Sequence, residues 1–183
     1  SHKSHQNSIS NNLQAPLDGV WYEEQNIIAS DGDANTTFGG AIKIDGDTAL
    51  IGASWDDDNG AKSGSAYVFT RTGDNWMQQA KLLPSDGHAD TEFGTMVSLD
   101  GDTALIGAYW DDENGNHSGS AYVFTRTGTT WTQQAKLLPS DGVADAQFGI
   151  ATAVSGDTAF VGANRDDDNG FQSGSVYVFT RSG

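Results

Sequence analysis

The sequence predicts an all-β protein, and two observations carry that prediction: a 55-residue internal repeat and short apolar segments separated by turn residues. No stretch shows the apolar spacing of an amphipathic helix. The repeat comprises residues 19–73, 74–128 and 129–183, which align without insertions or deletions. Its markers are a Phe-Gly pair, a tryptophan and a tyrosine, each recurring at the same spacing: Phe38, Phe93 and Phe148; Trp21, Trp76 and Trp131; Tyr67, Tyr122 and Tyr177.

Each repeat contains four predicted strands, and the second copy illustrates their order. The first is residues 76–83 (WMQQAKLL), which ends at Pro84 and a Ser-Asp-Gly turn. The next two, residues 95–100 (TMVSLD) and 103–108 (TALIGA), flank a Gly-Asp pair, which is a hairpin-turn signal. The last, residues 119–126 (GSAYVFTR), is apolar on both faces. A strand with two buried faces belongs in a stack of sheets.

The Phe-Gly pair at 93–94, the run GDTALIGA and the segment SGSAYVF together resemble the FG-GAP repeats of bacterial surface proteins and, more distantly, the integrin α-chain propeller. All three copies carry the pattern, so the resemblance covers residues 19–183. It implies a β-propeller of four-stranded antiparallel blades, with three blades in the chain. It also implies a secreted or bacterial cell-surface protein with a role in adhesion or matrix attachment.

Three blades do not close a ring, because propellers ordinarily have at least four. Two explanations are open: the chain is cut from a longer propeller, or two chains form a homodimer with six blades. By the blade order of the family, the chain begins with an outermost strand, residues 21–28, and ends after a third strand, residues 174–181. The outer strand of one chain is therefore expected to complete the last blade of its partner. Residues 1–18 are polar and are interpreted as an N-terminal arm or a remnant of cloning, outside the fold.

The chain is strongly acidic, with 25 Asp and Glu against 9 Lys and Arg and a formal net charge of −16. This charge argues against nucleic-acid binding and against adhesion to anionic membranes. No apolar run is long enough to insert into a membrane. There is no cysteine, so the chain has no disulfides and no thiolate chemistry, which suits a bacterial secreted protein as well as a cytosolic one. Divalent cations and neutral or cationic ligands are the favoured partners.

Three loops carry adjacent acidic residues followed by Asn-Gly: residues 54–64 (SWDDDNGAKSG), 109–119 (YWDDENGNHSG) and 164–174 (NRDDDNGFQSG). Oxygen ligands of this kind are those that Ca²⁺ prefers, and the Ser-Asp-Gly turn of a neighbouring loop is expected on the same propeller face. Each loop is therefore predicted to bind calcium through its first and third acidic residues and its asparagine, together with the turn aspartate. The predicted ligands are Asp56, Asp58, Asn59, Asp111, Glu113, Asn114, Asp166, Asp168, Asn169, Asp31, Asp86 and Asp141.

The loops do not follow the EF-hand pattern, because with Gly60 at the turn the first ligand position falls on Trp55. The alternative to calcium is that the Asp and Asn side chains cap their own turns by hydrogen bonding to the backbone, with the other carboxylates in solvent. Trp55 and Trp110 precede two of the acidic clusters, whereas Arg165 stands at the third. The two tryptophans are candidate sugar-stacking residues; the alternative is that they pack between loops.

No enzyme site is predicted. The four histidines are not repeated, and neither a nucleophile elbow, a zinc spacing nor a phosphate-binding loop occurs. Repeated weak sites on one face give avidity for repetitive ligands. We therefore expect a non-catalytic, calcium-dependent binding module for a polysaccharide or glycoprotein. A purely structural or assembly module is the alternative, and a polysaccharide lyase fragment is a weaker one.

Overall fold

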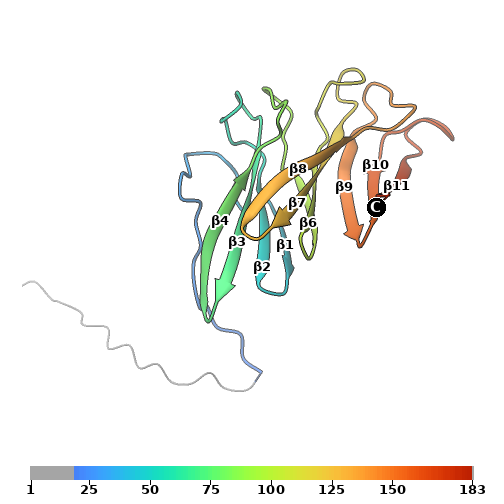
Figure 1. The fold of residues 1–183 in the computed structure, drawn as a ribbon. Helices are drawn as coiled ribbons and strands as arrows, with labels where there is room; N and C mark the ends of the chain where they lie inside the picture. Colours follow the sequence, from blue (N-terminus) through green and yellow to red (C-terminus); the bar gives the residue numbers. More distant parts are fainter. Residues whose placement is uncertain (1–18, 183) are drawn as a thin grey trace, which may run out of the picture.

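The computed structural model describes residues 19–182, and every regular element in that range is a β-strand. The eleven strands form three antiparallel sheets that lie side by side along the chain (Figure 1). Within the described range, no helix is long and apolar enough to cross a membrane. The segment interpreted as an N-terminal arm, residues 1–18, lies outside the described residues.

The strands of each sheet follow one another in chain order, so each sheet is a meander. The first sheet contains β1 (Ala41–Asp45), β2 (Thr48–Ala53), β3 (Ser65–Thr72) and β4 (Asn75–Leu82). The second contains β5 (Met96–Asp100), β6 (Thr103–Ala108), β7 (Ser120–Thr127) and β8 (Thr130–Leu137). The third has three strands, β9 (Phe148–Ser155), β10 (Thr158–Ala163) and β11 (Ser175–Thr180).

The four strands predicted for the second repeat are confirmed, but the sheets do not coincide with the sequence repeats. The outermost strand of each four-stranded sheet comes from the repeat that follows, because β4 begins the second repeat and β8 begins the third. The prediction of four-stranded blades therefore holds for the first two sheets, and the third has three strands within the described residues.

The predicted strand over residues 21–28 is wrong, because the structure has no regular element there. A strand is held by pairing with a neighbour, and the sheet that this segment would complete is not part of the described chain. The segment instead runs beside β4 (Figure 1). The Gln25 side chain makes two hydrogen bonds to the backbone of Trp76, at 3.0 and 2.9 Å.

The sheets pack on one another through the Phe-Gly pairs. Phe93 is fully buried and contacts Tyr122 edge-on, with ring centroids 5.4 Å apart. The glycine of the next pair, Gly149, places its carbonyl oxygen against Gly107 of β6, where a Cβ would overlap it. A small residue is thus required on the strand that faces the neighbouring sheet.

A β-bulge in each outer strand determines which side chains share a face. In the second sheet, Arg126 pairs with Trp131 and Tyr122 pairs with Lys136. The register shifts between Val123 and Phe124, so one residue of β8 has no partner in β7. Trp131 and Lys136 are five residues apart, which would place them on opposite faces of a regular strand, and the bulge places them on the same face.

Candidate site at the acidic loops

The acidic loops and the Ser-Asp-Gly turns lie at the same end of the sheets, as predicted. Loop 54–64 connects β2 and β3, and the segment after β4 crosses beside it. Backbone hydrogen bonds join the two: the Asp90 N–H donates to the Ala61 carbonyl at 2.7 Å, and the Phe93 N–H donates to the Ser63 carbonyl at 3.1 Å. The second and third sheets repeat this crossing with Asp145 and Asn116.

At this end of the first sheet, three carboxylates surround the ammonium of Lys81, which belongs to β4. The Nζ atom lies 2.8 Å from Asp31 and 2.7 Å from Asp58. It also lies 3.0 Å from Asp56, whose carboxylate is buried. The hydroxyl of Tyr67 donates to Asp56 at 2.9 Å. The negative charge of the buried Asp56 carboxylate is thus compensated by the Lys81 ammonium and by hydroxyl donors, including that of Tyr67.

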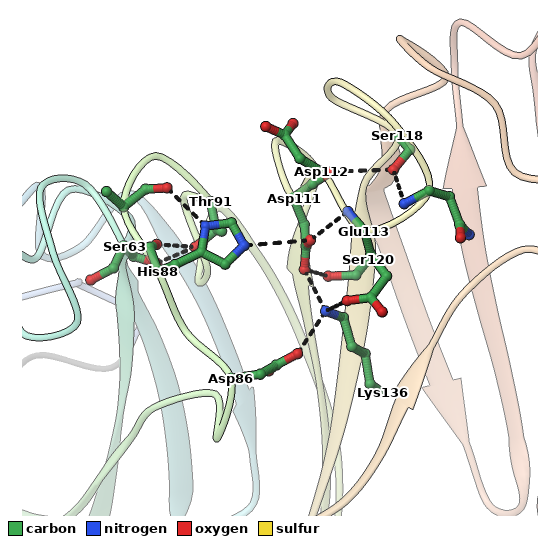
Figure 2. A network of polar contacts seen from close by, with 12 residues as sticks. Ser63, Asp86, His88, Thr91, Asp111, Asp112, Glu113, Ser118, Ser120 and Lys136 are labelled. Carbon is green, nitrogen blue, oxygen red and sulfur yellow. Dashed lines mark hydrogen bonds and ion pairs between the residues drawn. The ribbon is translucent and has the colours of Figure 1, made fainter.

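The second sheet carries the same arrangement around Lys136 of β8 (Figure 2). The Nζ atom lies 2.7 Å from Asp86, 2.9 Å from Asp111 and 2.9 Å from Glu113. Asp111 is fully buried and also accepts hydrogen bonds from Ser120 Oγ, at 2.7 Å, and from the Tyr122 hydroxyl. We call the groups centred on Lys81 and Lys136 the two lysine-centred sets.

The third sheet has the carboxylates of such a set and, in the described residues, no lysine among them. The Tyr177 hydroxyl donates to Asp166, and Asp141 is close enough to affect the same hydroxyl. Repulsion from Asp166 raises the pKa of Asp168. Tyr177 is half-buried, whereas Tyr67 and Tyr122 are 1% exposed.

The lysine-centred sets change the acidity of their members. Burial of the Asp111 carboxyl by itself would raise its pKa, but the hydrogen bonds from Ser120 and Lys136 outweigh it, so the pKa is lowered. The pKa of Asp56 is lowered in the same way, against its burial, by Lys81 and Tyr67. Burial raises the pKa of Tyr67 to about 12. Because their pKa values are lowered, Asp31, Asp56, Asp86 and Asp111 are ionised at neutral pH.

Two of the acidic residues also form their own turns, as the alternative interpretation expected. The Asp58 N–H donates to Asp56 Oδ1 at 3.1 Å, and the Lys62 N–H donates to Asp57 Oδ1 at 2.7 Å. Equivalent bonds occur in the second and third loops, with acceptors Asp111, Asp112, Asp166 and Asp167. The sequence Asp-Asp-Asp-Asn-Gly is therefore in part a turn motif.

These contacts bear on the calcium ligands predicted from the sequence. In the first two sheets, the ammonium already contacts the carboxylates that would bind the ion, so those sets do not fit calcium. The side chain of Asn59, one of the predicted ligands, donates to the Pro84 carbonyl at 3.4 Å. Within the described residues, no group of three or more acidic or histidine side chains is arranged to hold a metal ion. Calcium binding by the protein as a whole stays a prediction.

The two candidate sugar-stacking tryptophans differ in their surroundings. Trp55 is 42% exposed, and the ammonium of Lys62 lies 5.0 Å from its ring centroid. Trp110 is half-buried and packs against His117, with ring centroids 4.0 Å apart. Trp55 is thus partly exposed beside Lys62, while Trp110 packs within its loop.

The sequence reasoning missed the two lysines and the tyrosines that complete the sets. Their signal was present, because Lys81 and Lys136 recur at the 55-residue spacing together with Tyr67 and Tyr122. Their place in predicted strands gives no sign of the carboxylates that they contact. The bulge in β4 and β8, which turns each lysine toward the carboxylates, has no simple sequence signature.

Comparison with known proteins agrees with this repeated architecture. The family model described as FG-GAP repeat matches the chain three times, over residues 21–69, 76–124 and 131–179. Each matched stretch ends in the third strand of a sheet, β3, β7 or β11. No curated protein matches the chain.

Proposed function

Because the chain belongs to the FG-GAP repeat family, we propose that it is a non-catalytic binding module of a propeller-like protein, which recognises a polysaccharide or glycoprotein through its acidic loops. The observation that carries the proposal is the repetition of one loop at one end of successive sheets. A row of equivalent sites suits a ligand that is itself repetitive, because each weak contact adds to the avidity.

The chemistry of the loops supports a sugar ligand. The inner carboxylates of the first two sheets are held by lysine, so they serve the fold, and the outer side chains are left for binding. Trp55 is 42% exposed, and Phe171, in the equivalent loop of the third sheet, is 86% exposed. Aromatic faces beside carboxylates provide the stacking surface and the hydrogen-bond acceptors that a pyranose requires.

A secreted or cell-surface location and an absence of catalysis are parts of the same proposal. The histidines His88 and His117 sit in two loops without a repeated partner. His88 lies 3.9 Å from Asp111, which is already occupied by Lys136. That arrangement supports a structural role for the histidine and provides no nucleophile.

The experiment is a glycan array followed by calorimetry with the polysaccharides that bind, each with and without calcium. We expect saturable binding that Trp55→Ala weakens about ten-fold, the effect of losing one well-placed aromatic contact. Met77→Ala is the matched control, because Met77 is an exposed apolar side chain of β4 outside the loops. A blank array would contradict the binding proposal and favour a purely structural module.

A further inference from the structure

A groove with a volume of about 330 Å³ crosses the first strands of all three sheets, and we propose that it binds one unit of a neutral sugar. We call it the inner groove. Its volume lies within the range of small-molecule sites, roughly 300–1,000 Å³. The residues from β1, β5 and β9 that line it include Lys43, Asp45, Ser98, Asp100, Thr152 and Val154.

The inner groove lies apart from the acidic loops. Asp45 and Asp100 end β1 and β5 at the hairpin turns, whereas the acidic loops begin at the far ends of β2 and β6. The groove is therefore a second site, and its occupation does not depend on sugar binding by the loops.

The strands that line the inner groove each have a free edge in the described residues. β1 pairs only with β2, β5 only with β6 and β9 only with β10. β5 contacts both β1 and β9. Backbone N–H and C=O groups on a free edge are available to a ligand, so the groove offers main-chain donors and acceptors as well as side chains.

Two hydroxyls of the inner groove have no hydrogen-bond partner within residues 19–182. They are Oγ of Ser98, a residue that is 6% exposed, and Oγ1 of Thr152. Proteins pair the great majority of their buried polar groups, because an unpaired one lowers stability. Two such hydroxyls in one groove indicate a partner that is not part of the chain.

The two hydroxyls face each other where β5 and β9 meet. Ser98 shares a strand face with Asp100, which accepts a hydrogen bond from the Gly156 N–H of the third sheet at 2.5 Å. Thr152 shares a face with Val154, which packs against the apolar core between the second and third sheets. A ligand hydroxyl at this boundary would donate to one of the two oxygens and accept from the other.

The repeat itself does not require these hydroxyls. Lys43 and Ala153 stand at the positions equivalent to Ser98 in the other two repeats. Val97 stands one repeat before Thr152 and packs against the core between the first and second sheets. Since apolar side chains occupy the same places in the same strands, a ligand explains the hydroxyls better than the fold does.

The charged groups of the inner groove favour a neutral ligand. The Lys43 ammonium is a donor, and the carboxylates of Asp45 and Asp100 are acceptors. Asp45 is held in place by the Gly101 N–H, at 2.7 Å. An anion would lie beside two carboxylates and a cation beside an ammonium, so each is opposed by part of the site. The hydroxyls of a sugar both donate and accept, and they suit this mixture.

The test is an NMR titration of the whole 183-residue chain with glucose, galactose and mannose, each added separately at pH 7. Saturable shifts of the amide signals of residues 97–100 and 152–154 are expected with at least one of them, with a Kd on the order of 1 mM. Glucuronate and glucosamine are expected to bind several-fold more weakly. Absence of saturable shifts with all three neutral sugars, or tighter binding of a charged one, would overturn the proposal.

Variants of the two hydroxyl residues test whether they hold the sugar. Ser98→Ala and Thr152→Val are each expected to weaken sugar binding about five-fold, the effect of one hydrogen bond. In the free protein neither is expected to lower Tm, because each removes an unpaired hydroxyl and leaves a similar volume. A lower Tm would show that the hydroxyl has a partner within the fold and would count against a ligand there.

Trp55→Ala is the control for sugar binding at the acidic loops, and it is expected to leave the affinity of the inner groove unchanged. If Trp55→Ala abolished the shifts and Ser98→Ala did not, the groove proposal would fail and binding by the loops would stand. Saturable binding in the groove together with a blank polysaccharide array would have the opposite meaning.

Discussion

The ammonium of Lys136 lies 2.9 Å from the carboxylate of Asp111, which is fully buried in the loop that connects the second and third strands of its sheet. Three carboxylates meet at this single cation. Lys136 thus connects the outer strand β8 to the loops at one end of the sheet. We expect the stability of the sheet to depend on this lysine.

Lys136→Met is expected to lower the free energy of unfolding by about 2–4 kcal/mol. The reason is that Asp111 would stay buried without its cation, and breaking a buried pair in this way is strongly destabilising. Urea denaturation measures the change. Lys43→Met is the control, because Lys43 is exposed on β1, and its effect is expected within about 0.5 kcal/mol. Equal effects of the two variants would contradict this role of Lys136.

Acid is expected to destabilise the protein below about pH 4. The pKa values of Asp31, Asp56, Asp86 and Asp111 lie below the ordinary value of 3.8 in the folded state. Groups with lowered pKa values contribute stability above their unfolded pKa, and that stability is lost as the pH falls through the folded pKa. Thermal unfolding followed at pH 2 to 7 measures this. A Tm that stayed constant from pH 5 to pH 2 would contradict it.

Alkali is expected to destabilise the protein from about pH 10 upward. Burial raises the pKa of Tyr67 from 10.0 to about 12, so the unfolded chain loses this proton at a lower pH than the folded chain does. The raised pKa therefore contributes stability that is present below pH 10 and is lost as the pH rises toward 12. Tyr67→Phe is expected to reduce the loss of unfolding free energy between pH 10 and pH 12, measured by urea denaturation at each pH. An unchanged dependence on pH would exclude Tyr67 as the cause of the loss.

Equivalent aspartates in the first and third sheets are expected to respond in opposite directions to the same substitution. Asp58→Asn removes a contact with Lys81 and is expected to lower the free energy of unfolding by about 0.5–1 kcal/mol. Asp168→Asn removes repulsion from Asp166, which raises the pKa of Asp168, and is expected to raise Tm. Differential scanning calorimetry at pH 7 compares the two variants. Destabilisation by both would show that Asp168 has a partner of its own.

Two equivalent glycines are expected to differ sharply in their tolerance of alanine. At Gly107 the added Cβ would overlap the Gly149 carbonyl oxygen of the neighbouring sheet, so Gly107→Ala is expected to destabilise by about 3 kcal/mol. At Gly162, in the third sheet, the nearest atom is the Ala151 Cβ at 3.2 Å, and Gly162→Ala is expected to cost about 1 kcal/mol or less. Neither glycine has a positive φ, so the comparison isolates the contact between sheets.

Removing divalent cations is expected to change Tm by less than about 1 °C at pH 7. The cations that neutralise the first two carboxylate sets are lysines of the chain itself, so chelation removes nothing from them. The measurement compares Tm in EDTA with Tm in millimolar calcium. A calcium-dependent rise that Asp166→Asn abolishes would place an ion at the third sheet, where the sequence predicts one.

Much of the fold could be predicted from the sequence, because the same pattern of apolar segments and turn residues occurs in three aligned copies. The strand containing Thr103 and Ala108 is bounded as predicted, and the Gly101-Asp102 turn precedes it. The segment around Trp21 was predicted wrongly for a physical reason: its sequence is that of an outer strand, but a strand exists only with a partner. The sequence pattern of a segment does not show whether a neighbouring strand is present to pair with it.

The candidate site was predicted in part. The sequence predicted that Asp56 and Asp58 meet a Ser-Asp-Gly turn on the same face, without deciding between the turns of Asp31 and Asp86. The structure brings Asp31 to them, at the shared cation Lys81. The sequence did not identify the cation among them, because a lysine in a strand is most often a solvated side chain. Only the bulge in β4 reveals that Lys81 turns toward the loops.

The outer strand of each four-stranded sheet comes from the following sequence repeat, and this arrangement determines how the chain can change in length. β4 belongs to the second sequence repeat but pairs in the first sheet, and β8 belongs to the third repeat but pairs in the second sheet. Both junctions between repeats therefore contain the same strand pairing, the same lysine contact and the same Phe-Gly packing. Duplicating or deleting one 55-residue unit in the gene would recreate an existing joint and require no new interface. At each joint, a whole unit can therefore be added or removed while the local structure stays constant.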